Sequence, residues 1–350
     1  MPPKIKSLDK LIAVPKVKVI PRKPAQSRFD VVSVGDATLD LFVNIHDASV
    51  MCSLDKQNCW MCLNYGEKIP IQDLQSTIGG NACNNAVGVA RLNLKAGFYS
   101  IIGDDETGRK IMDRLKKEGV STEYIHVEKK HLSNYSVVLR FRTERTILVY
   151  HEPRHYNLPK LATTQWIYLT SLGKEFQKTH ERVVRQLKNC CAKLMFNPGT
   201  HQLHAGFKKL EPILKVTHTL ILNKEEARSL LGKQDNEQMK DLLRELHHIG
   251  PEVAIITDGP KGAYGYDGKQ FYRMKPLPAK VLERTGAGDS FATGVLAAFC
   301  YGKDLSEALL WGSANAASVV ESVGPQAGLL TKAQLLKRIC NYKGYCKALK

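Results

Sequence analysis

The sequence lacks a long apolar run. No stretch is long and apolar enough to span a bilayer, and the N-terminus has no apolar core of the kind that signal peptides carry. These absences argue against a helical membrane protein and against a membrane partner. We therefore expect a protein of the cytoplasm.

The cysteines do not form the pattern of a disulfide framework. The chain has 9 cysteines, an odd number, and at 350 residues it is long enough to build a core without cross-links. Five of them occupy apolar or helix-like surroundings, where cysteine behaves as a small hydrophobic side chain: Cys83, Cys190, Cys191, Cys300 and Cys340. We expect reduced thiols in a reducing compartment.

Two common nucleotide-binding motifs are absent. The segment Gly103 to Lys110 has the outline of a Walker A loop but lacks its Gly-Lys-Ser/Thr ending. The set of motifs that marks protein kinases is also missing. If the protein uses a nucleotide, it does so through another kind of site.

Acidic residues are the scarcer charged class, with 34 Asp and Glu against 51 Lys and Arg, a net charge of +17. This excess favours anionic ligands such as nucleotides and phosphorylated metabolites, and weak association with nucleic acid. A lysine-rich source proteome explains the same number equally well, so charge alone identifies no partner.

The composition divides the chain into three parts. Residues 1–28 are rich in Lys and Pro without sustained periodicity, which predicts a basic N-terminal extension. Residues 29–340 form the predicted globular domain, and residues 341–350 a basic C-terminal tail. We see no internal repeat.

From Phe29 onward, short apolar runs alternate with helical patterns, which predicts an α/β fold. The expected strands are Val31–Gly35, Ala96–Gly103, Trp166–Leu172, Leu194–Asn197, Thr219–Asn223 and Val253–Thr257. The expected helices are Asn81–Leu94, Gly108–Glu118, Glu225–Leu231, Asn236–His248 and Ser290–Tyr301. Such alternation predicts a three-layer arrangement, a mainly parallel sheet between two layers of helices.

Two segments interrupt the alternation, residues 44–75 and 134–152. Ser136–Arg142 and Thr146–Tyr150 flank a short polar turn and read as a β-hairpin. Together the two segments predict a small second sheet that forms a lid over the site.

The strongest chemical signal is the run Arg284 to Gly294. Gly286, Ala287 and Gly288 stand directly before a helical pattern, so their backbone N–H groups and the helix dipole predict an anion hole. Asp289 at the helix start is placed to accept a proton from a hydroxyl group. The alternative is an ordinary Asp N-cap after a glycine turn.

Two further runs carry polar groups suited to a polyol. Gly79 and Gly80 lead into a helix whose first turns hold Asn84, and Asp40 follows the first strand in Gly35-Asp36-Ala37-Thr38-Leu39-Asp40. Glycine allows a ligand to approach the backbone, and Asn and Asp bind hydroxyl groups. Plain helix and turn starts are the alternative.

Two elements after later strands suit a nucleotide and a metal. Asn223 and Glu226 fit a hydrated Mg²⁺, although the same pair is a capping box. The glycine-rich turn Thr257 to Ala263 fits a nucleotide loop, although alone it is merely a turn.

In this order and spacing, these elements resemble the ribokinase-like or PfkB family of carbohydrate and nucleoside kinases, from roughly residue 29 to 337. The resemblance implies an ATP-dependent kinase with Asp289 as catalytic base and an anion hole at Gly286, Ala287 and Gly288. It implies sugar contacts at Asp40, Gly80 and Asn84, with Gly79 beside them. It places Mg²⁺ and phosphate at Asn223 and Glu226, and the nucleotide at Thr257, Gly259, Gly262 and Asn315. It also suggests a homodimer formed through the lid.

The chain departs from the family pattern at two places. Glu283 stands where Asp is frequent in the region that holds a monovalent cation in some members, a region that here also includes Thr285 and the Gly324–Gly328 loop. K⁺ dependence is therefore an open question. Gly173 replaces a substrate-binding Glu of some sugar kinases, which argues against ribose in particular.

Two clusters outside these motifs suggest additional ligands. His46, Cys52, Cys59 and Cys62 are enough for a structural Zn²⁺ site, with reduced cysteines packed under the lid as the alternative. Arg140, Arg142, Arg145 and Arg154 lie in or after the hairpin and could bind an anionic group on the substrate, with a solvated strand face as the alternative.

The sequence therefore predicts an ATP-dependent phosphotransferase acting on a sugar or related polyol. A nucleoside kinase of the same fold is the first alternative, because Phe141 and Tyr150 could form an aromatic slot for a base. A non-catalytic protein that binds nucleotide or nucleic acid is the second, although we do not expect nucleic acid to be the partner.

Overall fold

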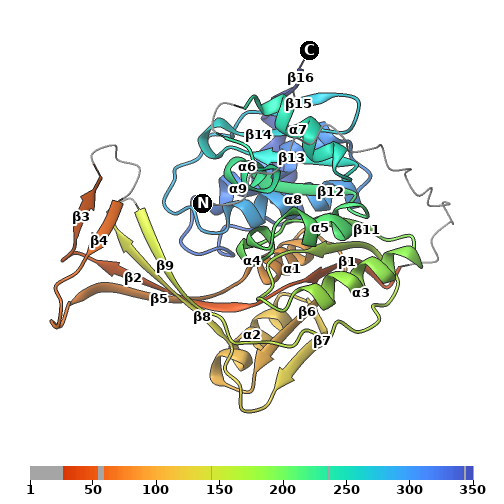
Figure 1. Ribbon diagram of the computed structural model, residues 1–350. Coiled ribbons are helices and arrows are strands. Elements are labelled where there is room, and N and C mark those ends of the chain that lie inside the picture. The colour runs from red at the N-terminus through yellow and green to blue at the C-terminus, as the bar shows by residue number, and fades with distance from the viewer. Residues whose placement is uncertain (1–26, 54–58, 143, 235–236, 343, 350) are drawn as a thin grey trace.

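The computed structural model describes residues 27–53, 59–142, 144–234, 237–342 and 344–349. Most of the expected extension 1–28 thus lies outside the described residues. Two sheets of very different size dominate the described chain (Figure 1).

The large sheet has ten strands in the order β16-β15-β14-β13-β12-β11-β10-β1-β6-β7. From β7 to β13 neighbouring strands pair in parallel, and β14, β15 and β16 continue the sheet antiparallel. The bounds are β1 (Phe29–Val34), β6 (Ala96–Gly103), β7 (Ser121–Glu128), β10 (Thr164–Leu169), β11 (Lys193–Phe196), β12 (Thr219–Asn223), β13 (Val253–Thr257), β14 (Ala263–Tyr266), β15 (Phe271–Met274) and β16 (Cys346–Leu349). The prediction of a mainly parallel sheet is confirmed.

Alternate residues of the central strands enter two separate cores, because successive side chains of a strand point to opposite faces. Val31 and Tyr168 pack in one core, and Val32 and Ile167 pack in the other. Most residues of these strands are apolar, as expected for a sheet that is covered on both faces.

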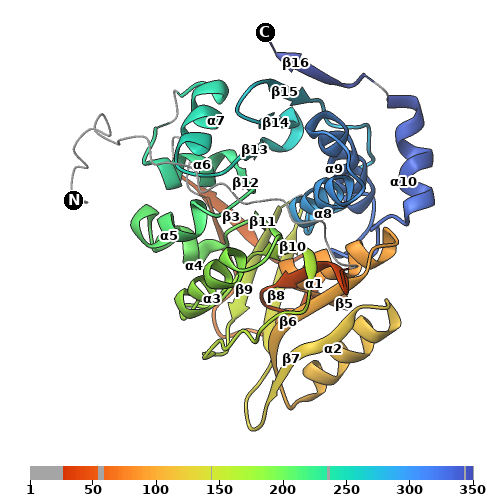
Figure 2. The same ribbon diagram turned by 90° about the vertical axis from the view of Figure 1, so that its right-hand side faces the viewer.

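Helices cover both faces, which confirms the three-layer prediction (Figure 2). One layer consists of α1 (Asn81–Arg91), α2 (Glu106–Lys117), α8 (Ala287–Cys300), α9 (Leu305–Val319) and α10 (Lys332–Ile339). The other consists of α3 (Gln177–Lys188), α4 (Thr200–His204), α5 (Phe207–Leu214), α6 (Lys224–Leu231) and α7 (Met239–His248).

The second sheet has four strands in the order β5-β2-β8-β9 and extends sideways from the body (Figure 1). Its strands are β2 (Thr38–Ile45), β5 (Ile71–Gly79), β8 (Asn134–Phe141) and β9 (Glu144–Tyr150). The pair β3 (Ser49–Cys52) and β4 (Cys59–Cys62) forms a hairpin at its far end. We call these six strands the lid.

The lid contains the predicted hairpin as β8 and β9. The lid begins before residue 44, because its first strand, β2, starts at Thr38. Thr38 pairs with Gly79, the last residue of β5. Asp40, expected in a loop after the first strand, therefore lies on a lid strand.

The C-terminal segment is also different from the expectation. Residues 346–349 form β16, which pairs antiparallel with β15 at the edge of the large sheet. The domain therefore continues beyond residue 340, and the predicted tail is in part a strand.

No helix of the described residues is long and apolar enough to cross a membrane.

Candidate active site

The turn before α8 has the backbone conformation that the anion-hole prediction requires. Gly286 has φ +81°, and a Cβ there would lie 2.5 Å from the Cβ of Pro325, so the position accepts only glycine. A Cβ on Gly288 would meet no atom within 4 Å, so this residue borders open space. Ala287 N–H donates to the carbonyl of Arg284 at 3.3 Å. The first turn of α8 thus presents amide groups beside open space at Gly288.

Asp289 lies in that first turn, and its carboxylate is held by a single side chain across the site. The amide of Asn84, on α1, donates to Asp289 Oδ2 at 2.8 Å. Burial raises the pKa of Asp289 to about 6, and the charges of Asp40 and Glu226 act in the same direction, while the Asn84 hydrogen bond opposes them. A carboxyl with a pKa near 6 is ionised at neutral pH and remains basic enough to take a proton.

The side chain of Asn84 is itself oriented by a chain of hydrogen bonds. Gln326 Nε2 donates to Asn84 Oδ1 at 3.1 Å, and Arg114 Nε donates to Gln326 Oε1 at 3.1 Å. With its oxygen occupied by a donor, the amide of Asn84 must direct its N–H groups toward Asp289. Gln326 is a site residue that the sequence analysis missed, because nothing in its local pattern distinguishes it.

Asp40 faces the same region from the lid. It is 7% exposed, and burial raises its pKa to about 6, with a hydrogen bond to Ser136 opposing the shift and the charge of Glu283 adding to it. A Cβ on Gly79 would lie 2.2 Å from Asp40 Oδ2, so the absence of a side chain at Gly79 makes room for this carboxylate. Gly80, with φ +94°, completes the sharp passage from β5 into α1.

A second buried carboxylate, Asp36, was not among the predicted site residues. The hydroxyl of Tyr156 donates to its two oxygens at 2.9 and 3.0 Å, and His151 Nε2 lies 3.2 Å from Oδ2. Burial raises the pKa of Asp36 to about 7. The same residue stands in the run Gly35 to Asp40 after β1, which was the available signal, but its partners come from a distant loop that shows no motif.

His151 connects this cluster to α4. Its ring centroid lies 5.8 Å from that of His201, and burial lowers its pKa, with the charges of His201 and Arg154 acting in the same direction. Gly173 N–H donates to the hydroxyl of Tyr156 at 2.8 Å, and a Cβ on Gly173 would lie 2.9 Å from that oxygen. The hydroxyl of Tyr156 therefore lies next to Gly173, the position at which some sugar kinases carry a substrate-binding glutamate.

The pair Asn223 and Glu226 forms the capping box at the start of α6. Glu226 N–H donates to Asn223 Oδ1, and Asn223 N–H donates to Glu226 Oε2, both at 2.8 Å. Burial raises the pKa of Glu226, and its charge also raises that of Asp289, so the two carboxylates interact. This donor set consists of oxygen atoms, which suits Mg²⁺ held through water.

The predicted nucleotide turn follows β13. Thr257 ends that strand, and Gly259 begins a short 3-10 turn (Gly259–Lys261). Gly262 has φ +97°, and a Cβ there would lie 2.1 Å from the carbonyl oxygen of Met274, so only glycine fits.

Asn315, which the family resemblance assigns to the nucleotide, lies in the interior of α9. It is fully buried in α9, its Nδ2 donates to the Ser290 carbonyl at 2.8 Å, and its Oδ1 accepts from Leu330 N–H at 3.1 Å. Both ends of the amide are used to join α8, α9 and the following loop. The side chain of Asn315 therefore joins these elements, and its assignment to the adenine stays a prediction.

Glu283 occupies the predicted cation region with one oxygen satisfied and one not. Oε1 accepts hydrogen bonds from Arg284 N–H at 3.1 Å and from the N–H and hydroxyl of Thr285. Oε2 is buried and has no hydrogen-bond partner among the described residues. Arg145, on the lid strand β9, lies 3.9 Å from Oε1. An orphaned buried carboxylate oxygen is consistent with a bound cation.

The predicted zinc ligands do not form a metal site. Cys52 and Cys59 are joined by a disulfide bond between β3 and β4, so neither offers a thiolate. Cys62 is a free cysteine, and in the described chain no group of three or more His, Cys, Asp or Glu side chains could hold a metal. The expectation of reduced thiols is therefore wrong for Cys52 and Cys59.

The four arginines of the hairpin region have separate roles. Arg140 pairs with Asp73 at 3.4 Å, and Arg154 is buried against Glu128 and the Leu132 carbonyl. Arg142 lies in the turn with φ +56°, so it does not share a strand face with Arg140. Of the four, Arg145 lies beside Glu283, and the charge of Arg154 acts on Asp36 and His151.

Comparisons with known proteins identify the family of the chain. The sequence model of the pfkB family of carbohydrate kinases matches residues 40–332. An uncharacterized sugar kinase of Archaeoglobus fulgidus is 26% identical over 69% of this chain and 98% of its own length. The 5-dehydro-2-deoxygluconokinase of Bacillus subtilis is 24% identical over 74% of this chain and 85% of its own.

The fold is shared with solved structures. The ribokinase of Arabidopsis thaliana, complexed with ribose and ATP, superimposes with a TM-score of 0.75 at 21% identity. The superposition covers 89% of this chain and 99% of that one. This likeness identifies the ribokinase fold.

Proposed function

The chain belongs to the pfkB family of carbohydrate kinases and is an ATP-dependent sugar kinase, and from this premise we propose which residues perform the reaction. Asp289 is the general base, and the first turn of α8 at Gly286, Ala287 and Gly288 is the anion hole. The observation that supports this most strongly is the half-buried Asp289 carboxylate, held by Asn84 beside an open helix start.

The reaction transfers one phosphoryl group. The acceptor hydroxyl gives its proton to Asp289, its oxygen bonds to the γ-phosphorus, and the bond to the β,γ-bridging oxygen of ATP breaks. The helix amides stabilise the charge on the transferring group. Asn84 keeps the carboxylate oxygen at a fixed position, so that its lone pair is available to the acceptor.

Asn223 and Glu226 would hold Mg²⁺ through water, and the ion would neutralise charge on the ATP phosphates. The turn from Thr257 through Gly259 to Gly262 would surround the nucleotide. These assignments rest on the family resemblance and on the oxygen-rich environment of Glu226.

We propose that the acceptor is a sugar or sugar-derived polyol bound between Asp40 and Asp36, with Asn84 and the backbone of Gly79 and Gly80 beside it. Ionised carboxylates accept hydrogen bonds from vicinal hydroxyl groups. A nucleoside is less well supported, because Phe141 is 9% exposed and the hydroxyl of Tyr150 is bound to Glu152, so the two do not form a free aromatic slot.

The test is ADP release measured with candidate acceptors, namely sugars, sugar acids, sugar phosphates and nucleosides. We expect turnover with a polyol acceptor in the wild type and almost none in Asp289→Asn. A nucleoside as the preferred acceptor would replace the sugar proposal. Binding of nucleic acid without ADP release on any acceptor would overturn the catalytic one.

A monovalent cation is proposed at Glu283 and Thr285, next to the Gly324–Gly328 loop, where the unpaired oxygen of Glu283 is available. Turnover in K⁺ and in tetramethylammonium buffers of equal ionic strength tests this. Equal rates would show that Arg145 supplies sufficient positive charge, and that no ion is needed.

We also propose a homodimer formed through the lid and, because ATP is a cytoplasmic metabolite, a cytoplasmic location that cell fractionation can test. The lid exposes many large apolar side chains, among them Trp60, Leu74 and Leu148. Exposed apolar area of this kind favours association with another protein surface.

A further inference from the structure

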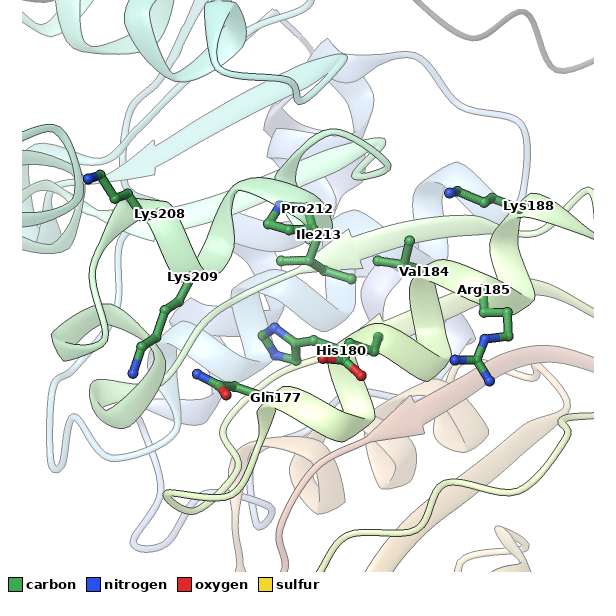
Figure 3. A pocket seen from close by; sticks show the side chains of 10 residues that line it. Gln177, His180, Val184, Arg185, Lys188, Lys208, Lys209, Pro212 and Ile213 are labelled. Carbon is green, nitrogen blue, oxygen red and sulfur yellow. The ribbon is translucent and has the colours of Figure 1, made fainter.

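A groove between α3 and α5 lies in the outer helix layer and contains none of the residues assigned above. Its volume is about 410 Å³, within the usual range for small-molecule sites. Gln177, His180, Val184 and Lys188 line it from α3, and Lys209 and Ile213 line it from α5 (Figure 3).

The rim of the groove is strongly cationic. Arg185 and Lys188 contribute from α3, and Lys208 and Lys209 from α5, against the single carboxylate of Glu181. Within the described chain none of the four cations forms an ion pair, although many other lysines and arginines do. Their mutual repulsion is therefore not relieved by the protein and would be relieved by an anion.

The interior of the groove is apolar, with Val184 on one side and Pro212 and Ile213 on the other (Figure 3). Pro212 lies inside α5, where it fixes the backbone. An anion without an apolar part would leave this surface in water. The groove thus suits an amphipathic ligand with an anionic group at one end.

His180 adds an observation that surface charge does not explain. Its side chain lines the groove and is 5% exposed, yet neither ring nitrogen has a hydrogen-bond partner among the described residues. The ring packs against Phe176 at 4.8 Å and Phe196 at 5.4 Å. Burial lowers its pKa to about 3, so the ring is neutral and offers both a donor and an acceptor. Leaving a polar group buried without a partner is costly, which points to a partner that binds here.

We propose that the α3–α5 groove binds a small phosphate monoester with an apolar body. The phosphate contacts Lys208 and Lys209 at the α5 end of the groove, the body packs on Val184, Pro212 and Ile213, and His180 provides a hydrogen bond from the floor (Figure 3). The groove is separate from the ATP and acceptor sites, so the ligand binds while both are filled.

The test is titration calorimetry with 1-naphthyl phosphate on the full chain, at low salt, with the active site saturated by Mg²⁺ and a non-hydrolysable ATP analogue. We expect one binding event per chain. The double variant Lys208→Ala/Lys209→Ala should weaken it by about tenfold or more, because each charge-assisted contact contributes substantially. Lys116→Ala/Lys117→Ala, an exposed lysine pair on α2, is the matched control and should bind as the wild type does.

Absence of binding to the wild type, or equal affinity in both double variants, would overturn the proposal. Inorganic phosphate binding as tightly as naphthyl phosphate would overturn the apolar part of it. As a direct readout at the floor, the imidazole NMR signal that disappears in His180→Gln should shift on addition of naphthyl phosphate. If calorimetry detects binding but the His180 signal does not shift, the ligand binds elsewhere on the protein.

Discussion

At the scale of single residues, Asp289 combines a catalytic position with an energetic cost. Burial raises the pKa of three carboxylates, Asp289, Asp40 and Glu226, and the charges of the last two raise the pKa of Asp289 further. Such a group is ionised at neutral pH only at the expense of folding stability. Removal of the charge should therefore affect activity and stability in opposite directions.

Asp289→Asn should lower kcat by about 10²–10⁴-fold, because the proton acceptor is lost. It should also raise stability at pH 7 by about 1–2 kcal/mol, since Asn can still accept from Asn84 without a buried charge. ADP release and thermal unfolding measure the two effects. A variant that is both active and no more stable than the wild type would contradict the assignment.

The sign of the pH dependence follows from the same shift. The folded pKa of Asp289, about 6, lies above the ordinary value of 3.8, so stability from this group is greatest at low pH. It falls as the pH rises from about 4 to 6 and is constant above. Activity has the opposite sign, because kcat/KM requires the ionised base and should rise through a midpoint near 6.

Asn84→Leu should move that midpoint upward, because the hydrogen bond from Asn84 favours the ionised form of Asp289. Asn81→Leu is the matched control, since Asn81 lies on the same helix but donates to Ser171. The pH profile of kcat/KM distinguishes the two variants. An equal shift in both would mean that α1 was disturbed as a whole.

At the scale of elements, the start of α8 and the turn after β13 use glycine for different reasons. Gly288 borders open space, whereas Gly262 is in close contact with Met274. A side chain at Gly288 would not collide with the protein, whereas a side chain at Gly262 would. Replacing each by alanine separates function from folding.

Gly288→Ala should lower kcat by about 10²-fold and leave the melting temperature unchanged, because its methyl group enters only the anion hole. Gly262→Ala should lower stability by about 1–3 kcal/mol, because of its positive φ and the contact with Met274. Thermal unfolding and ADP release provide both readouts. A stability loss in Gly288→Ala would show that the turn has a structural demand not visible in its contacts.

Elements with strong local patterns were predictable. The bounds of β6, β12 and β13 agree with the sequence prediction, because each is an apolar run ended by polar or glycine residues. The helix α9 was not predicted, because it is buried on nearly all sides and lacks a polar face. The strand β16 was missed because its pairing with β15 is a contact between distant segments.

The candidate site divides in the same way. The residues proposed for phosphoryl transfer occupy one continuous run at Gly286 to Asp289, so local spacing alone was enough to suggest them. The cluster of Asp36, Tyr156 and His151 is assembled from separate segments, so no spacing reveals it. Asn315 was assigned to the nucleotide from the family pattern, and that pattern does not indicate that its side chain is fully buried.

At the scale of the whole molecule, the lid has one face toward the site and one away from it. Asp40 and Phe42 share the first face, because alternate residues of β2 point to the same side. Leu41 and Val43 point to the opposite face. On that face Val43 pairs with Leu74 of β5. Leu41 pairs with Val137 of β8, which in turn pairs with Leu148 of β9. Leu74 is 57% and Leu148 54% exposed, so this outer face is the better candidate for the dimer interface.

Leu74→Asp/Leu148→Asp should convert the proposed dimer to a monomer, since two buried charges per subunit are incompatible with an apolar interface. Light scattering after size-exclusion chromatography measures the mass. Leu132→Asp, an exposed leucine outside the lid sheet, is the control and should leave the mass unchanged. A wild type that is monomeric at micromolar concentration would reject the interface altogether.

The direct passage from β5 into α1 has a consequence for fidelity. Gly80 alone separates the last residue of a lid strand from the helix that carries Asn84. A lid that shifts when an acceptor fills the space beside Asp40 must also reposition the amide that orients Asp289. With Asp289 as the proposed base, its alignment would then depend on a bound sugar, and ATP would be protected from wasteful attack by water when no sugar is bound.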